Sequence, residues 1–151
     1  MKGMQAMSWL LIVVFIISSV ASESSYTRIR GAGTYRVHES WVNWDTANAT
    51  CTAEGAHLAI PGQVAEYVAI ASLTTYHPYV GIRRQDGQFR TVNGTLLSLL
   101  AYVHWAQNEP DQSGDCIFLD TEEKALYDFP CEDVNVFVCE KPQSDYEIHD
   151  K

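Results

Sequence analysis

The chain has 151 residues and a formal net charge of −9 at pH 7, from 19 acidic and 10 basic side chains. This acidic balance argues against nucleic acid and against anionic membrane surfaces as partners. The length fits one domain with its own hydrophobic core.

Residues 1–21 have the pattern of a secretory signal peptide. Lys2 supplies a positive charge, an apolar run covers residues 9–17, and small residues form a cleavage zone around Ala21. The run is too short to cross a bilayer, and no second run of spanning length follows. We therefore predict a secreted, extracellular protein, in which residues 22–33 form a polar tail or linker.

Two amphipathic helices are predicted in the first half of the chain. Asn43 is a suitable cap for the first helix, and Gly55 is a suitable end. The buried stripe of this first helix consists of Trp44, Ala47 and Cys51. The second helix covers residues 64–73, and the residues expected on its core side are Val64, Tyr67, Val68 and Ala71.

Seven short strands are predicted around these helices. They cover residues 34–37, 57–60, 79–82, 89–92, 116–119, 125–128 and 136–140. Residues 95–115 lack a convincing periodicity, which is unusual inside a compact domain unless the segment is functional. Their leucines and aromatic residues argue against disorder, so we expect an ordered loop with an apolar underside. Residues 142–151 form a polar tail.

The four cysteines are Cys51, Cys116, Cys131 and Cys139. An even number in a secreted chain indicates two disulfides, and the count alone leaves three pairings open. A structural zinc site is the competing use of cysteine. The chain has no Cys-x-x-Cys pair and its histidines are scattered, which argues against zinc.

Two N-glycosylation sequons lie in segments that we expect at the surface. Asn48 lies off the buried stripe of the first helix, so a glycan fits there sterically. Asn93 begins an Asn-Gly-Thr sequence on an expected turn. We predict a glycan on each asparagine.

The stretch W-A-Q-N-E-P-D-Q-S-G-D-C, residues 105–116, carries several acidic side chains. Pro110 stands between Glu109 and Asp111, and its ring restricts the local backbone. Calcium prefers oxygen ligands from carboxylates and loop carbonyls. The alternative is an ordinary polar turn with solvated acids, and the triplet alone does not decide between the two.

In order and spacing these motifs resemble the C-type lectin-like domain in its short form with four cysteines. The resemblance covers residues 33–141. It implies a mixed α+β fold in which two helices flank small antiparallel sheets, with a long calcium-binding loop and the disulfides Cys51–Cys139 and Cys116–Cys131. The motifs that carry it are the helix with Cys51, the strand 79–82, Trp105, Glu109-Pro110-Asp111, Cys116, Leu126-Tyr127-Asp128, Cys131 and Phe137-Val138-Cys139-Glu140.

Sugar-binding members of the family hold calcium with a Glu-Pro-Asn or Gln-Pro-Asp triplet, a further acid and an Asn-Asp pair on the next strand. The resemblance assigns Glu109, Asp111 and Asp128 of this chain to the metal, and it implies a cis bond before Pro110. Two vicinal sugar hydroxyls complete the calcium shell in such a site. Each hydroxyl also donates a hydrogen bond to a carboxylate and accepts one from an amide.

The chain departs from the family pattern at two positions. Gly114 stands where the further acid is expected, and Tyr127 stands where the strand asparagine is expected. Asp115 is a candidate to replace the missing acid as a metal ligand. Gln112 is a candidate hydrogen-bond donor to the ligand, because ionised carboxylates only accept hydrogen bonds. Tyr127 is a candidate ligand contact beside Asp128.

The resemblance thus implies a secreted, calcium-dependent carbohydrate-binding protein for microbial or cell-surface glycans. The alternative is a lectin-like module that binds protein or another ligand without calcium, which the two departures favour. We expect no enzyme, because the chain lacks a nucleophile elbow and a phosphate loop. The triplet mixes mannose-type and galactose-type features, so it predicts no sugar class. The sequence predicts nothing about self-association.

Overall fold

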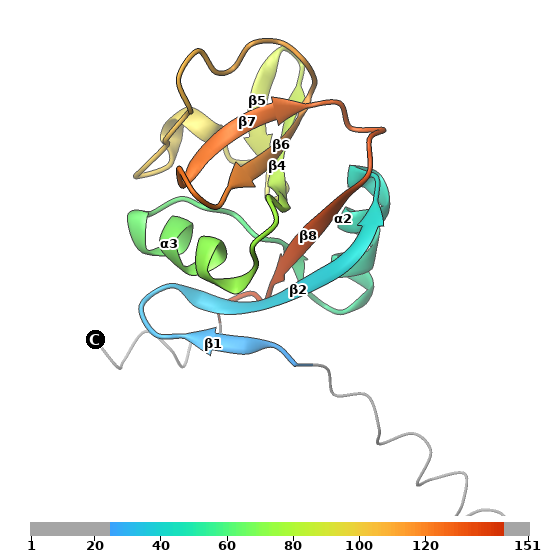
Figure 1. The fold of residues 1–151 in the computed structure, drawn as a ribbon, viewed down its shortest axis with the longest axis vertical. Coiled ribbons are helices and arrows are strands. Elements are labelled where there is room, and N and C mark those ends of the chain that lie inside the picture. Colours follow the sequence, from blue (N-terminus) through green and yellow to red (C-terminus); the bar gives the residue numbers. More distant parts are fainter. Residues whose placement is uncertain (1–24, 144–151) are drawn as a thin grey trace, which may run out of the picture.

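Eight strands of the described chain form a single curled sheet, and two helices pack against it (Figure 1). The computed structural model describes residues 25–143, so the predicted signal peptide and residues 144–151 of the predicted tail lie outside the described residues. No helix within the described range is long and apolar enough to cross a membrane. The elements in chain order are β1 (Thr27–Ile29), β2 (Gly33–Val42), α2 (Trp44–Ala53), β3 (His57–Leu58), α3 (Val64–Leu73), β4 (Tyr79–Gln85), β5 (Gln88–Thr91), the 3-10 turn η1 (Leu97–Leu99), β6 (Cys116–Asp120), β7 (Ala125–Phe129) and β8 (Asn135–Glu140).

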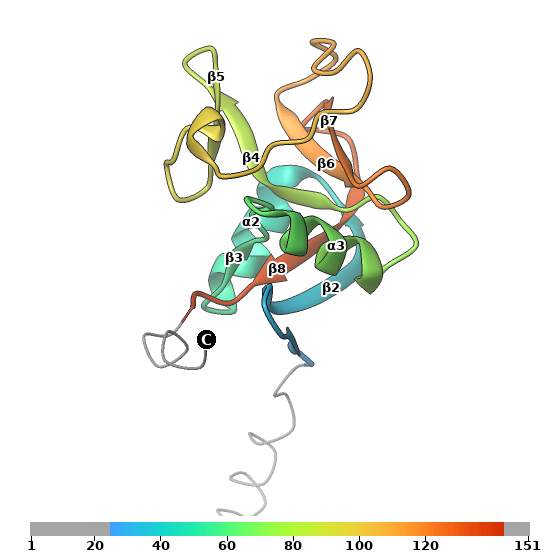
Figure 2. The ribbon, with the colours of Figure 1, turned by 90° about the vertical axis from the view of Figure 1, so that its left-hand side faces the viewer.

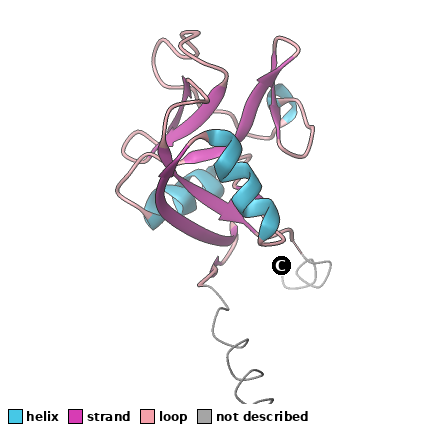
Figure 3. Cartoon of the chain, turned by 90° about the vertical axis from the view of Figure 1, so that its right-hand side faces the viewer, coloured by secondary structure: helices cyan, strands magenta, loops and turns pink. Residues whose placement is uncertain are grey.

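The strand order in the sheet is β1-β2-β8-β4-β6-β7, with β3 paired to β8 and β5 paired to β4. The antiparallel pair of β2 and β8 forms the lower half of the sheet as drawn in Figure 1, and Val37 lies opposite Val138 in this pair. Helix α2 packs against β3 and β8, and α3 packs against β2 and β6. Figure 3 shows the helices beside the strands. The predicted mixed α+β fold with two helices is confirmed.

The upper half consists of two hairpins that point away from the β2–β8 pair as separate arms (Figure 2). One arm is β4 with β5, and the other is β6 with β7. The chain between β5 and β6 passes from one arm to the other, in the upper half of the described structure (Figure 2).

This connecting segment is ordered, and the prediction of an apolar underside is confirmed. Leu97 is buried, and Tyr102 and Trp105 pack against the core. Leu99 is an exception, with 72% of its surface exposed. The main chain is anchored on β7, because Leu126 N donates a hydrogen bond to the carbonyl oxygen of His104, while Ala106 N donates to that of Leu126.

Helix α2 follows its prediction closely. The Asn43 side chain accepts a hydrogen bond of 2.9 Å from Thr46 N, which satisfies one free donor of the first turn. Trp44, Ala47 and Cys51 are buried as predicted. Gly55 ends the helix at a φ of 67°, a conformation that glycine adopts without steric cost.

Two local predictions are wrong. Residues 27–29 of the predicted linker form β1, which pairs with β2 because the chain turns back at Gly31 with a φ of 78°. In α3 the predicted core residues Val64 and Val68 are 56% and 47% exposed. The buried residues of α3 are Tyr67, Ala69 and Ile70. Apolar residues occur all round this helix, so their spacing does not fix the buried face.

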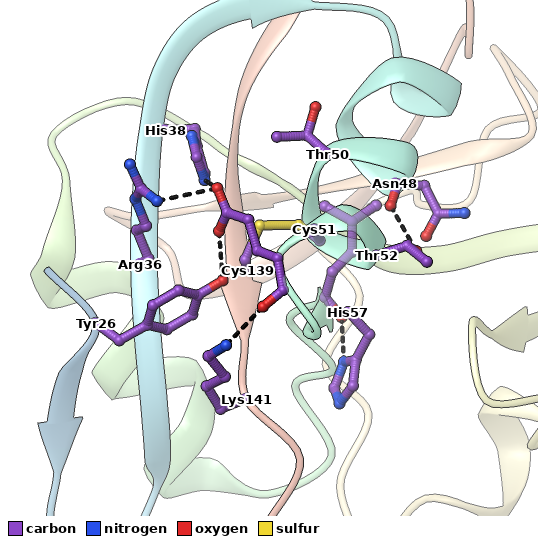
Figure 4. The surroundings of a disulfide bond; sticks show 12 residues. Tyr26, Arg36, His38, Asn48, Thr50, Cys51, Thr52, His57, Cys139 and Lys141 are labelled. Carbon is purple, nitrogen blue, oxygen red and sulfur yellow. Dashed lines mark hydrogen bonds and ion pairs between the residues drawn. A yellow bond between two sulfur atoms is a disulfide. The ribbon is translucent and has the colours of Figure 1, made fainter. Parts of the chain in front are cut away.

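Both disulfide pairings implied by the resemblance are confirmed. Cys51–Cys139 joins α2 to β8 (Figure 4), and Cys116–Cys131 joins the start of β6 to the segment after β7. Beside the first disulfide, the carboxylate of Glu54 accepts hydrogen bonds from Tyr26 Oη at 2.6 Å and Arg36 Nη1 at 3.0 Å (Figure 4). These bonds tie β2 and the segment before β1 to the end of α2.

Candidate cation site

Three carboxylates from two segments converge beside β7. Glu109 and Asp111 flank Pro110, and the Glu109–Pro110 peptide bond is cis, as the resemblance implied. Asp128 lies on β7 itself. One carboxylate oxygen from each of the three side chains lies within 4.8 Å of the other two. We call Glu109, Asp111 and Asp128 the acid cluster.

Hydrogen bonds fix the acid cluster to the main chain on both sides. Asp111 N donates to Asp128 Oδ1 at 3.0 Å, and Asp128 N donates to Glu109 Oε2 at 3.2 Å. Ser113 Oγ donates to the carbonyl oxygen of Asp128 at 2.6 Å. These bonds join the loop to the strand through the carboxylates of Glu109 and Asp128.

The acid cluster carries more negative charge than its hydrogen bonds satisfy. Asp128 is only 3% exposed, and its Oδ2 atom is buried with no hydrogen-bond partner. Desolvation, together with the adjoining Asp128 carboxyl group, raises the pKa of Glu109. Hydrogen bonds from Ser113 lower the pKa of Asp111, which therefore stays ionised at neutral pH.

The acid cluster fits a hard divalent cation. A buried carboxylate oxygen without a donor is costly unless a cation or a donor faces it. Calcium takes six to eight oxygen ligands, so three carboxylates supply part of a shell that carbonyls, water or ligand hydroxyls would complete. Glu109, Asp111 and Asp128 are the residues that would hold the ion.

The structure does not bring Asp115 into the acid cluster. Its Oδ1 atom accepts a hydrogen bond of 3.1 Å from Arg84 Nε, and its carbonyl oxygen accepts one of 2.7 Å from Arg84 N. The side chain of Asp115 is 63% exposed. Asp115 thus binds Arg84 on β4 and does not join the other carboxylates.

Arg84 is the residue of this region that sequence analysis missed. Its guanidinium lies 4.3 Å from the ring centre of Phe89, and its Nη2 atom lies 3.7 Å from Asp128 Oδ2. Its neighbour Arg83 pairs instead with Asp45 on α2. Alternation along β4 sends the two side chains to opposite faces, and nothing in the sequence says which of them meets the acids.

Tyr127 and Gln112 lie around the acid cluster without entering it. The Tyr127 ring stacks on Phe118 at 5.1 Å, and its hydroxyl donates to Glu123 Oε2 at 3.0 Å. The ring therefore does not plug the space between the carboxylates. Gln112 is exposed in a turn with a φ of 68°, where its amide is accessible to a ligand.

The backbone explains why Gly114 carries no acid. A Cβ atom at Gly114 would lie 2.1 Å from the carbonyl carbon of Phe129. Main-chain atoms cannot move aside as a flexible side chain can, so any side chain here would force the loop away from β7. The loop approaches β7 so closely at Gly114 that this position has no room for an acidic side chain.

A second group of potential metal ligands comprises His38, Glu54 and Cys139. Cys139 is oxidised in the disulfide with Cys51, so its sulfur cannot serve as a thiolate ligand. His38 stacks on Phe137 at 4.6 Å and lies 3.1 Å from a Glu54 oxygen. This group is a packing and polar contact beside the disulfide.

Two surface hollows adjoin other candidate residues. An apolar hollow of about 490 Å³ has Pro110 and Trp105 in its wall, next to the acid cluster. A polar hollow of about 420 Å³ is lined by both sequon residues, Asn48 and Asn93. Asn93 is exposed and Asn48 is half-buried, so glycans on both would cover the same hollow.

Comparisons with known proteins agree with this architecture. The family model described as the lectin C-type domain matches residues 40–141. A mouse scavenger receptor C-type lectin carbohydrate-recognition domain has a TM-score of 0.68 at 20% identity, over 79% of this chain and 96% of that chain. A herring type II antifreeze protein has a TM-score of 0.70 at 21% identity, over 82% and 100%. Human lithostathine has a TM-score of 0.68 at 22% identity, over 81% and 92%.

Proposed function

The chain belongs to the C-type lectin domain family, and from this premise we propose that it is a secreted protein that binds glycans through a calcium ion at Glu109, Asp111 and Asp128. The observation that carries the proposal is the buried Oδ2 atom of Asp128, which has no hydrogen-bond partner, on a side chain with one carboxylate oxygen within 4.8 Å of an oxygen of Glu109 and of Asp111. Domains of this family are typically binding domains and not enzymes, so a binding role is the simplest use of this site.

In this proposal the protein positions the carboxylates, and the ion would coordinate the ligand. A calcium ion held by Glu109, Asp111 and Asp128 would supply a Lewis acid for two vicinal sugar hydroxyls. Glu109 and Asp111 would then accept hydrogen bonds from those hydroxyls, and the exposed Gln112 amide is a candidate donor from the same loop. Surface glycans of microbes or cells are the proposed partners, with no sugar class assigned.

A second candidate is binding without calcium, and one observation favours it. The guanidinium of Arg84 lies 3.7 Å from Asp128 Oδ2 and so partly neutralises the acid cluster in the absence of metal. The absence of the family's acid at Gly114 and of its asparagine at Tyr127 points the same way. In this case the ligand is a protein or another surface, and the acids serve the fold.

Thermal unfolding in calcium, in magnesium and in chelator separates the two candidates. Calcium that binds only the folded chain stabilises it by about 2.7 kcal/mol at a hundredfold excess over its dissociation constant. We expect a rise in Tm with calcium that Asp128→Asn abolishes. Asp86→Asn is the matched control, because Asp86 is an exposed acid with a φ of 51°, which asparagine tolerates. No rise in the native chain would refute the calcium proposal.

A glycan array with and without chelator tests the ligand. Calcium-dependent binding that Asp128→Asn removes would support the proposal, whereas binding that persists in chelator would favour the second candidate.

Secretion is a separate part of the proposal. Intact mass of the secreted protein should show removal of residues 1–21 and glycans on Asn48 and Asn93.

A further inference from the structure

Arg84 is held on three sides beside the acid cluster. Its Nε atom donates to Asp115 Oδ1 at 3.1 Å, its guanidinium lies on the face of Phe89 at 4.3 Å, and its Nη2 atom approaches Asp128 Oδ2 to 3.7 Å. The Arg84 side chain is 25% exposed, and that of Asp128 is 0% exposed. The cation is therefore built into the site and is not a mobile surface group.

The contact between Arg84 and Asp128 is an ion pair without a hydrogen bond. A distance of 3.7 Å is too long for a hydrogen bond, and Asp128 Oδ2 has no other partner. Water screens a charge pair at such a buried oxygen only weakly. The same oxygen can thus be compensated in two ways, by the guanidinium or by a metal ion.

From this geometry we propose that Arg84 is a resident cation of the acid cluster, which stabilises the metal-free fold and weakens calcium binding. The calcium part of the inference rests on the proposed function. A calcium ion bound to Asp128 would lie within a few ångströms of the guanidinium, and like charges at that separation repel. Asp115 is then a positioning residue, because its carboxylate holds the guanidinium against Phe89.

This inference gives Asp115 an indirect role in calcium binding. In the sequence it stands next to a position where the family has a metal ligand. In the structure its carboxylate binds the cation that competes with the metal. Neutralising Asp115 would free Arg84 to approach Asp128 more closely, so Asp115→Asn should weaken calcium binding although Asp115 lies outside the acid cluster.

The test compares Arg84→Gln with Arg83→Gln. Both changes remove one positive charge from β4, but Arg83 pairs with Asp45 at 2.6 Å, and Asp45 is 68% exposed. We expect Arg84→Gln to lower the Tm in chelator by several degrees and to tighten the calcium dissociation constant about tenfold, a size typical of one neighbouring charge. Arg83→Gln should leave that constant unchanged within about twofold. Calorimetric titration with calcium alone measures the constant.

A double-mutant cycle in chelator separates this inference from the proposed function. If Arg84 compensates Asp128, Arg84→Gln should cost much less stability in an Asp128→Asn background. Such coupling, with a tighter calcium constant for Arg84→Gln, supports the inference. Coupling with no calcium binding by the native chain or by Arg84→Gln would sink the proposed function and leave Arg84 as the permanent counter-ion. No coupling, or an unchanged or weaker calcium constant for Arg84→Gln, would overturn the inference.

Discussion

The carboxyl group of Glu140, at the end of β8, should make the stability of the fold depend on pH. Glu140 is 7% exposed, and its Oε2 atom accepts a hydrogen bond of 3.0 Å from Ile60 N. Burial raises the pKa of Glu140 from 4.5 to about 7, although the bond from Ile60 opposes this rise. The folded chain therefore binds this proton more tightly than the unfolded chain does.

The direction of the effect follows from this difference. The contribution of Glu140 is fully present below pH 4.5, where both states are protonated, and it is lost as the pH rises through about 7. The pKa difference corresponds to about 3 kcal/mol, of which about 2.5 kcal/mol falls between pH 5 and pH 8. Glu140→Gln keeps an oxygen for Ile60 N but has no proton to lose.

The assay is urea unfolding of the native chain and of Glu140→Gln at pH 5 and pH 8, in chelator. The native chain should lose about 2.5 kcal/mol more than the variant between the two pH values. Glu122→Gln is the matched control, because Glu122 is exposed. If Glu140→Gln and the native chain lose the same stability over this range, the carboxyl group is ionised in the fold and the reasoning is refuted.

Two further predictions concern packing and cross-links. Gly114→Ala should cost at least about 2 kcal/mol, because its Cβ would lie 2.1 Å from the carbonyl carbon of Phe129. Gly62→Ala, whose Cβ would have its nearest contact at 3.5 Å, should stay within about 1 kcal/mol, and equal urea midpoints for the two variants would contradict this account. Removing Cys51–Cys139, with a sequence separation of 88, should lower the free energy of unfolding by about 4.5 kcal/mol. Removing Cys116–Cys131, with a separation of 15, should lower it by about 3 kcal/mol. Urea unfolding of the two double alanine variants checks the order, and a larger loss for the shorter loop would contradict the chain-entropy reasoning.

Local patterns in the sequence predicted the parts of the fold that depend on local physics. The cap at Asn43 and the stop at Gly55 bound a helix because each satisfies a backbone requirement within a few residues. The face of α3 could not be predicted in this way. Its apolar residues surround the helix, and the packing of β2 and β6 against it decides which side is buried.

The same distinction applies to the candidate site. The triplet at Glu109 and Asp111 and its partner Asp128 could be matched through the family resemblance, and the structure brings all three together. Arg84 is 25 residues earlier in the chain than Glu109 and carries no motif. Its contact with Asp128 arises because β6 pairs with β4 on one side and with β7 on the other, and the residues around Arg84 and Asp128 do not encode these pairings locally.

The two hairpin arms and the first and last described residues lie at opposite poles of the described structure. β1 and the end of β8 share the lower pole, whereas the segment that carries Pro110 crosses the upper one (Figure 1). A tether fused after residue 143 would therefore lie away from the loop that carries the candidate cation site. Copies displayed in this way on a bead or a lattice would all present the candidate cation site outward. Several weak contacts between such copies and a repetitive surface would then add up to strong overall binding.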